Sequence, residues 1–363
     1  MKTPKSADLS ITNRCNLRCA YCSHFESPAE AGDDLPTDIW LSFFEELSRL
    51  SVLNVCLSGG EAFTRTDLKE LIQGIVKNRM RFIILTNGTL ITDEMAAFIA
   101  STGRCDTVQV SIDGSTPITH DACRGPGNFA RAMEGLAALR RNRIPASVRV
   151  TIHRKNVHDL EEITRLLIHE VGLSGFSTNS AGYLGLCRRN AEQVQLTAED
   201  RSIAMASLLS LAKRYNGRIS AQAGPLAEAK GWAEMDRARI EGRKSMPGRG
   251  FLAGCNGSRQ TIAVRADGVF IPCSQLPHLE MGRIGRDDLR EIWQHHPTLT
   301  RLRERQTIPL TNFAFCEGCP YIPYCTGNCP ALAYTMTGND QHPAPDACLR
   351  LFLREGGRLP ALN

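Results

Sequence analysis

The sequence predicts an α/β fold in which a parallel sheet curls into an incomplete barrel, followed by a small cysteine-rich region. The first observation is a series of short apolar segments that alternate with amphipathic segments of helical length. The second is that this alternation amounts to six strand–helix units, fewer than the eight of a closed barrel. The third is that seven of the 14 cysteines lie beyond residue 250, where the alternation has ended.

The elements of the barrel follow one another at regular intervals. Strands are expected at 7–12, 53–58, 81–86, 106–112, 147–153 and 173–179. Helices are expected at 37–50, 66–79, 92–102, 127–142 and 157–171, with one more at 196–214. In such an arrangement the helices lie outside the sheet, and the loops at the carboxyl ends of the strands carry the chemistry.

The last third of the chain is organised differently. Residues 260–273 are typical of a β-hairpin whose turn is Asp267-Gly268. Residues 223–250 are rich in Ala, Gly, Lys and Arg, as in a bridge between domains. We therefore expect a barrel domain at 1–215, a bridging segment at 216–250, and a cysteine-rich domain with a β-hairpin and short helices at 251–363.

Composition places the chain among globular proteins. Of its 363 residues 42% are hydrophobic and 22% charged, and we find no apolar run long enough to cross a bilayer. The first residues lack the apolar stretch of a signal peptide, so a cytoplasmic location is expected, with cysteines that serve as metal ligands or reduced thiols. The net charge of +5 and pI of about 8.5 suit an acidic peptide or a nucleotide and identify neither. No nucleic-acid or membrane partner is expected.

Three cysteines near the start have the spacing C-x3-C-x2-C. They are Cys15, Cys19 and Cys22, and they follow the first expected strand. Three thiolates on one loop can hold three irons of a 4Fe–4S cube and leave the fourth iron without a protein ligand. The alternatives are a zinc knuckle, with His24 as a fourth ligand, and three unrelated buried cysteines.

The second expected strand ends in Gly59-Gly60-Glu61. Together with the cysteine triplet, this segment resembles the radical S-adenosylmethionine (SAM) superfamily. The resemblance implies a partial (β/α)6 TIM barrel, in which the Gly-Gly-Glu segment binds the methionine amino group of SAM while SAM chelates the open iron. Glycine allows a close approach of the backbone, and the Glu61 carboxylate or backbone carbonyls can accept hydrogen bonds from an ammonium.

The same resemblance implies further contacts to SAM at the ends of other strands. The expected cofactor-binding residues are Tyr21, Ser58, Gly59, Gly60, Glu61, Asn87, Ser111, Asp113 and Arg124. Asn179 and Ser180 lie where the family lines the adenine site. The alternatives are ordinary turns at Asn87-Gly88 and Asp113-Gly114, a solvated Arg124 and a core-facing Tyr21.

The seven later cysteines resemble the SPASM extension of radical SAM enzymes, which carries two additional 4Fe–4S clusters and implies three clusters in all. By the family's pattern, auxiliary cluster II is held by Cys316, Cys319, Cys325 and Cys348, and auxiliary cluster I by Cys255, Cys273 and Cys329. No eighth cysteine lies near Cys255, so auxiliary I has an open iron, a non-cysteine ligand or a distant thiol such as Cys187. A zinc ribbon at Cys316 and Cys319 would leave the hairpin cysteines unexplained.

The resemblance implies an enzyme that cleaves SAM to a 5′-deoxyadenosyl radical and abstracts a substrate hydrogen atom. We expect oxidative modification or cross-linking of a ribosomally made peptide. Ser274, which stands where sulfatase-maturing relatives have an acidic residue, argues against formylglycine formation. The alternative is dehydrogenation or epimerisation of a small molecule such as an aminosugar alcohol, with Cys187 as a candidate catalytic hydrogen donor or else an ordinary semi-buried cysteine.

Two kinds of protein partner are implied. One is an electron donor such as flavodoxin or ferredoxin. The other is a separate leader-peptide-binding protein, because only fourteen residues precede Cys15, too few for a leader-recognition domain. A bare electron carrier is a remote alternative, since it would need neither Gly59-Gly60-Glu61 nor a barrel.

Overall fold

The computed structural model describes residues 2–27 and 32–361. Its strands are β1 (Ser6–Ser10), β2 (Asn54–Ser58), β3 (Arg81–Thr86), β4 (Cys105–Ser111), β5 (Ala146–Ile152), β6 (Phe176–Ser180), β7 (Ile219–Ala221), β8 (Thr261–Val264), β9 (Val269–Ile271) and β10 (Gly282–Arg283). They form one ten-stranded sheet in the order β10-β9-β8-β1-β2-β3-β4-β5-β6-β7. Neighbouring strands from β8 to β7 are parallel, and β9 and β10 are antiparallel to their neighbours.

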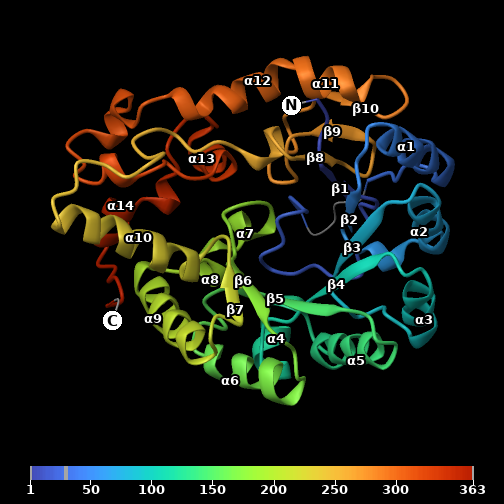
Figure 1. The fold of residues 1–363 in the computed structure, drawn as a ribbon. Coiled ribbons are helices and arrows are strands. Elements are labelled where there is room, and N and C mark those ends of the chain that lie inside the picture. Colours follow the sequence, from blue (N-terminus) through green and yellow to red (C-terminus); the bar gives the residue numbers. More distant parts are fainter. Residues whose placement is uncertain (1, 28–31, 362–363) are drawn as a thin grey trace.

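Helices cover the outer face of the curved sheet, as Figure 1 shows for α1, α2, α3 and α5. The helices of the barrel region are α1 (Thr37–Arg49), α2 (Leu68–Lys77), α3 (Asp93–Ser101), α4 (Pro117–Arg124), α5 (Asn128–Arg141), α6 (Leu160–Arg165), which continues as the π-helical turn η2 (Leu166–Glu170), α7 (Leu186–Arg189), α8 (Ala191–Val194), α9 (Ala198–Arg214) and α10 (Pro225–Ile240). The α/β fold with a partial parallel barrel is confirmed.

The carboxyl-terminal part consists of the β8–β9–β10 strands and short helices. These are α11 (Leu289–His295), α12 (Pro297–Glu304), α13 (Pro330–Thr337) and α14 (Leu349–Arg354), with 3-10 turns η3 (Asn256–Ser258), η4 (Arg305–Thr307), η5 (Leu310–Asn312), η6 (Ala314–Cys316), η7 (Ile322–Tyr324) and η8 (Pro345–Ala347); one further 3-10 turn, η1 (Ala62–Thr64), follows β2. The expected hairpin is confirmed, because β8 pairs antiparallel with β9 and Gly268 occupies the left-handed region at φ 84°.

Alternation along the strands separates the core from the barrel interior. On β1, Ala7 and Leu9 are fully buried toward the helices, whereas Asp8 points the other way. Helix α1 packs Trp40 and Phe44, one turn apart, into the same core. The apolar layer between sheet and helices therefore fixes the strands, and it leaves the interior face free for polar side chains.

Three features differ from the sequence-based expectations. Residues 216–250, expected to be a bridge, contain β7 and α10, and β7 extends the barrel sheet beside β6. Helix α4 was not expected. The hairpin does not stand apart from the barrel, because β8 pairs in parallel with β1, with Asp8 opposite Ala263. The proposed boundaries of the three segments remain predictions.

No helix in the described part of the chain combines the length and the hydropathy that a membrane crossing needs.

Candidate active site

The first cysteine triplet lies on the loop that leaves β1. Cys15, Cys19 and Cys22 are all partly exposed. Burial, together with the charge of Cys22, raises the pKa of Cys15 to about 11 and that of Cys19 to about 12. Cys15 and Cys19 therefore need a nearby cation to ionise, which metal coordination supplies.

Hydrogen-bond donors surround this triplet, which fits a thiolate-bound cluster. The Leu17 N–H donates to Cys15 Sγ at 3.4 Å, and Arg124 Nη1 lies 3.9 Å from Cys19 Sγ. Asn87 Nδ2 lies 4.0 Å from Cys15 Sγ and donates to Asn16 Oδ1 at 2.9 Å. Such donors stabilise the negative charge that cluster sulfurs carry.

The Gly59-Gly60 pair packs directly on the start of the cysteine loop. A Cβ on Gly59 would lie 2.3 Å from the Thr12 carbonyl oxygen, and a Cβ on Gly60 would lie 2.3 Å from that of Arg14. The same backbone is joined by hydrogen bonds from Gly60 N to Thr12 O and from Glu61 N to Arg14 O, at 2.9 and 2.8 Å. These glycines therefore hold the end of β2 against the cysteine loop.

The side chain of Glu61 is buried and already satisfied. It accepts from Thr86 Oγ1 at 2.8 Å, from Asn87 N at 2.7 Å and from Phe63 N at 3.2 Å. Burial raises the pKa of this carboxyl group, and the Asn87 N–H opposes that shift. The Glu61 carboxylate therefore joins β2 to the end of β3 through these hydrogen bonds. The backbone carbonyls are then the groups that remain available to accept hydrogen bonds from an ammonium.

Tyr21, Asp113 and Arg124 form one buried network instead of three separate contacts. Arg124 Nε donates to Asp113 Oδ2 at 2.5 Å, and the Tyr21 hydroxyl donates to the same oxygen. Asp113 is fully buried, and Arg124 is 7% exposed, which rules out the solvated arginine. Burial alone would raise the pKa of Asp113, but the charge and hydrogen bond of Arg124 together with the charges of His153 and His120 outweigh it, and the pKa is lowered. Because Arg124 also lies beside Cys19, this network helps to hold the cysteine loop in place.

The remaining expected SAM contacts lie at the carboxyl ends of their strands. Ser58 Oγ donates to Leu9 O at 3.4 Å, and Ser111 is paired in register with Arg149 of β5. Asn179 Oδ1 is buried without a hydrogen-bond partner among the described residues. An unsatisfied buried acceptor of this kind fits a missing ligand at the place where the adenine was expected.

The barrel interior holds charged residues that the sequence analysis missed. Asp8 of β1 lies opposite Cys56 of β2, and the two side chains share a hydrogen bond. Burial lowers the pKa of Arg149, and its Nε donates to Gln109 Oε1 at 2.9 Å. Ser177 Oγ, in register with Arg149, is buried without a partner in the described chain. The available signal was the presence of Asp and Arg at inward positions of otherwise apolar strands.

Cys187 occupies a different position from the one expected. It is fully buried in α7 and packs with Tyr21, Cys123 and Val194. The adjacent Leu186 N–H donates to Cys22 O at 2.8 Å, so α7 supports the first cysteine loop. Cys187 thus packs beside Cys19 of the first triplet, and its expected roles as a ligand of auxiliary I and as a hydrogen donor stay predictions. Its thiol has no exposed surface toward a substrate.

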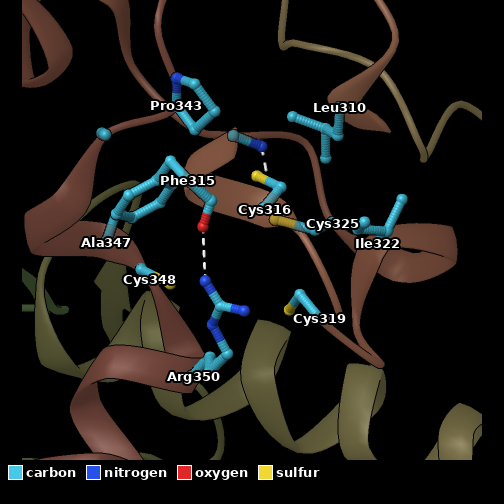
Figure 2. Close-up of a pocket in the computed structure, with 12 residues that line it drawn as sticks. Leu310, Phe315, Cys316, Cys319, Ile322, Cys325, Pro343, Ala347, Cys348 and Arg350 are labelled. Atoms are coloured by element: carbon cyan, nitrogen blue, oxygen red, sulfur yellow. Dashed lines mark hydrogen bonds between the residues drawn. The ribbon is translucent and has the colours of Figure 1, made fainter. Parts of the chain in front are cut away.

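Four cysteines surround one cavity near the carboxyl terminus (Figure 2). The cavity, of about 360 Å³ including space open to solvent, is lined by Cys316, Cys319, Cys325 and Cys348. Burial, together with the charges of the other three cysteines, raises the pKa of Cys316 to about 12. Four thiols directed at one space are the ligand set of a 4Fe–4S cluster, and they are the set expected for auxiliary II.

The other three SPASM cysteines also gather in one place. Burial raises the pKa of Cys273 to about 11, and the charges of Cys255 and Cys329 raise it further. Gly257 is required there, since a Cβ would lie 2.0 Å from the Pro272 carbonyl oxygen. Within residues 2–27 and 32–361, no set of three or more His, Cys, Asp or Glu side chains is arranged around a single metal ion. A cluster differs from that case because each thiolate binds its own iron.

Comparison with known proteins identifies the class. The radical SAM superfamily matches residues 9–167, and the SPASM iron–sulfur cluster-binding domain matches residues 255–320. The chain is a radical SAM enzyme with a C-terminal SPASM domain. It accordingly uses SAM, a radical SAM 4Fe–4S cluster and auxiliary iron–sulfur clusters.

Two curated relatives cover nearly the whole chain. The AdoMet-dependent heme synthase of Methanosarcina barkeri is 29% identical over 343 residues, which is 93% of this chain and 94% of that protein. The PqqA peptide cyclase of Ruegeria pomeroyi is 28% identical over 333 residues, which is 91% of this chain and 83% of that protein.

Solved structures share the fold. SuiB of Streptococcus suis bound to its precursor peptide SuiA has a TM-score of 0.72 at 14% identity, covering 96% of this chain and 76% of that one. AnSMEcpe with bound AdoMet and the Cp18Cys peptide has a TM-score of 0.70 at 16% identity and covers 97% of both chains.

Proposed function

We propose that this enzyme oxidises or cross-links a peptide substrate in the barrel interior. The observation that carries the proposal is the presence of two cysteine sets besides the first triplet, since a two-electron oxidation needs an electron acceptor close to the substrate. The similarity to a PqqA peptide cyclase along 91% of the chain supports a peptide. The similarity to a heme synthase along 93% of the chain favours the second candidate function, which is oxidation of a small molecule.

The proposed ligand sets follow the three gatherings of cysteines. Cys15, Cys19 and Cys22 would hold the SAM-binding cluster, and the four residues around the cavity of Figure 2 would hold auxiliary II. Cys255, Cys273 and Cys329 would hold auxiliary I with an open iron or a non-cysteine ligand. When bound, SAM and the first cluster supply a 5′-deoxyadenosyl radical, which removes hydrogen from an unactivated C–H bond.

The chain's own part is to bind, orient and exclude water. The carbonyls of Gly59 and Gly60 would accept from the SAM ammonium, and the Tyr21–Asp113–Arg124 network fixes the loop beneath it. Arg149 and Asp8 are two titratable groups of the interior, and we propose that they orient the substrate so that one C–H bond faces the radical. The enclosing helices keep competing hydrogen donors out.

The first test concerns radical formation. Protein reconstituted anaerobically with iron and sulfide should form 5′-deoxyadenosine from SAM and dithionite. Cys19→Ala should abolish this, because the cube then keeps two anchors in that loop. Cys105→Ala, which removes a thiol from β4 away from the triplet, is the matched control and should keep the activity. Normal SAM cleavage by Cys19→Ala would contradict the assignment.

The second test concerns the reaction and its substrate. Candidate substrates are short peptides encoded beside the gene, with porphyrin precursors and aminosugars as the comparison. Oxidation or cross-linking lowers the product mass by two hydrogens per event. Incorporation of one solvent deuteron without loss of hydrogen would instead show epimerisation, and a reaction confined to small molecules would exclude the peptide.

A further inference from the structure

Arg305 is fully buried at the start of η4, and its guanidinium donates only to main-chain carbonyl oxygens. Nε donates to Asp340 O at 2.8 Å, and Nη2 donates to His342 O at 3.0 Å. Nη1 donates to Ala253 O at 2.5 Å and to Asn328 O at 3.0 Å. Five N–H donors in a rigid fork suit this bridging of four loop carbonyls.

Two of these carbonyls belong to the loops that carry two cysteines of auxiliary site I. Ala253 lies two residues before Cys255, and Asn328 lies directly before Cys329. Asn328 has a left-handed backbone at φ 62°, and its Oδ1 accepts from Cys329 N at 2.7 Å. One side chain therefore sets the separation of the two loops.

The charge of Arg305 has no carboxylate partner in the described part of the chain. The Asp340 carboxylate forms an ion pair with Arg301 instead. Burial lowers the pKa of Arg305, and the groups that oppose this most are the thiols of Cys329 and Cys255. Because a buried charge without a counter-charge in contact is strongly destabilising, and the charge of Asp340 acts on Arg305 less than the two thiols do, an anion beside Cys329 and Cys255 fits this place.

We infer that Arg305 is a positioning residue of auxiliary site I, which joins the loops of Cys255 and Cys329 and balances the negative charge of the cluster they hold. The inference rests on the proposed assignment of Cys255, Cys273 and Cys329 to one cluster. Net charge and hydrogen bonding around the ligands are what set the reduction potential of such a cluster. Since reduction adds negative charge, a buried cation beside the cluster favours the reduced state.

The test compares full-length, anaerobically reconstituted variants by iron content and by potentiometric titration followed with electron paramagnetic resonance. Arg305→Gln should shift the midpoint of one auxiliary cluster to a more negative potential and lower its occupancy. Arg305→Lys keeps the positive charge, so its midpoint potential should be close to that of wild type. It loses the guanidinium that bridges the four carbonyls, so it should release four irons to a chelator faster than wild type. The cluster whose signal responds to SAM should be unchanged in both.

Arg350 provides the matched control. It donates to the main-chain carbonyls of Phe315 and Glu317 beside the cavity of auxiliary II. Arg350→Gln should therefore shift the other auxiliary cluster. Cys329→Ala identifies the signal of auxiliary I, because it should remove that signal.

These variants test the ligand assignment of auxiliary I separately from the role of Arg305. If Cys329→Ala kept both auxiliary signals and all the iron, the ligand assignment itself would be wrong. If Cys329→Ala lost one signal while Arg305→Gln kept wild-type potential and iron, the role of Arg305 would be refuted. Where Arg305→Gln does not fold, unchanged iron release from Arg305→Lys would refute it as well.

Discussion

Replacing Asp113 with Asn should destabilise the protein by about 3–4 kcal/mol, because it removes the counter-charge of a buried arginine. Asp113 Oδ2 accepts from Arg124 Nε and from the Tyr21 hydroxyl, whereas Oδ1 accepts from Thr151 N at 2.7 Å and would still do so in Asn. Losing a charge-assisted bond costs about 1.5–3 kcal/mol, and losing a neutral one about 1 kcal/mol. Breaking a buried pair on one side costs about 3–5 kcal/mol, which agrees.

The assay is equilibrium unfolding in urea, followed by circular dichroism under anaerobic conditions, on protein with and without its clusters. Arg124 lies beside Cys19, so the anionic first cluster should compensate part of the lost charge. The destabilisation is therefore expected to be larger in the cluster-free protein. The Asp113–Arg124 pair stabilises the protein through the lowered pKa of Asp113. This stabilisation is present at neutral pH and is lost as the pH falls through the pKa of Asp113 in the folded state.

A double-mutant cycle with Arg124→Gln isolates the pair. The double variant should be less destabilised than the sum of the single ones, by about 2 kcal/mol or more, since it leaves neither charge unpaired. A coupling below about 0.5 kcal/mol, or equal losses with and without clusters, would refute the reasoning about this network.

The ligand assignments predict about twelve irons per chain, and replacing Cys15, Cys19 and Cys22 together should leave roughly two-thirds of them; four irons or stoichiometric zinc in the reconstituted wild type would contradict this. Cys187→Ala should leave product and turnover unchanged and lower stability by about 1 kcal/mol, and a changed product would restore a catalytic role. Burial raises the pKa of Glu228 from 4.5 to about 7, so its stabilising contribution is full below pH 4.5 and is lost as the pH rises to about 7. Glu228→Gln should remove this slope, because an amide does not titrate; an unchanged slope in urea unfolding would contradict it.

The regular part of the fold was predictable because most of the expected strands carry an apolar pattern and alternate with amphipathic helices. Strand β3, for example, occupies Arg81–Thr86 as expected. Strand β7 is only three residues long, and its residues Ile219–Ala221 give no periodic signal. It forms because the edge of β6 offers unpaired backbone groups, which is a tertiary effect.

The candidate site was predictable to the level of motifs and not of contacts. The spacing of the cysteines marked them as ligands, and four of them line one cavity. Glu61 accepts hydrogen bonds from Thr86 and Asn87 because of the way β2 and β3 are paired. Local sequence patterns do not predict that pairing. Arg305 was missed for the same reason. It lies in a polar segment, and only the folded loops bury it.

The pairing of β8 with β1 explains how the barrel and the auxiliary region act as one structure. Strand β1 leads into the first cysteine loop, while β8 and β9 lead into Cys273. Phe270 of β9 is fully buried against Phe43 of α1, with ring centroids 5.7 Å apart, in the same core as the barrel strands. Gln275 Nε2 also donates to Ser23 Oγ at 3.4 Å, which joins the residues beside Cys273 and Cys22. The separation of the proposed sites is therefore fixed by strand register and shared packing.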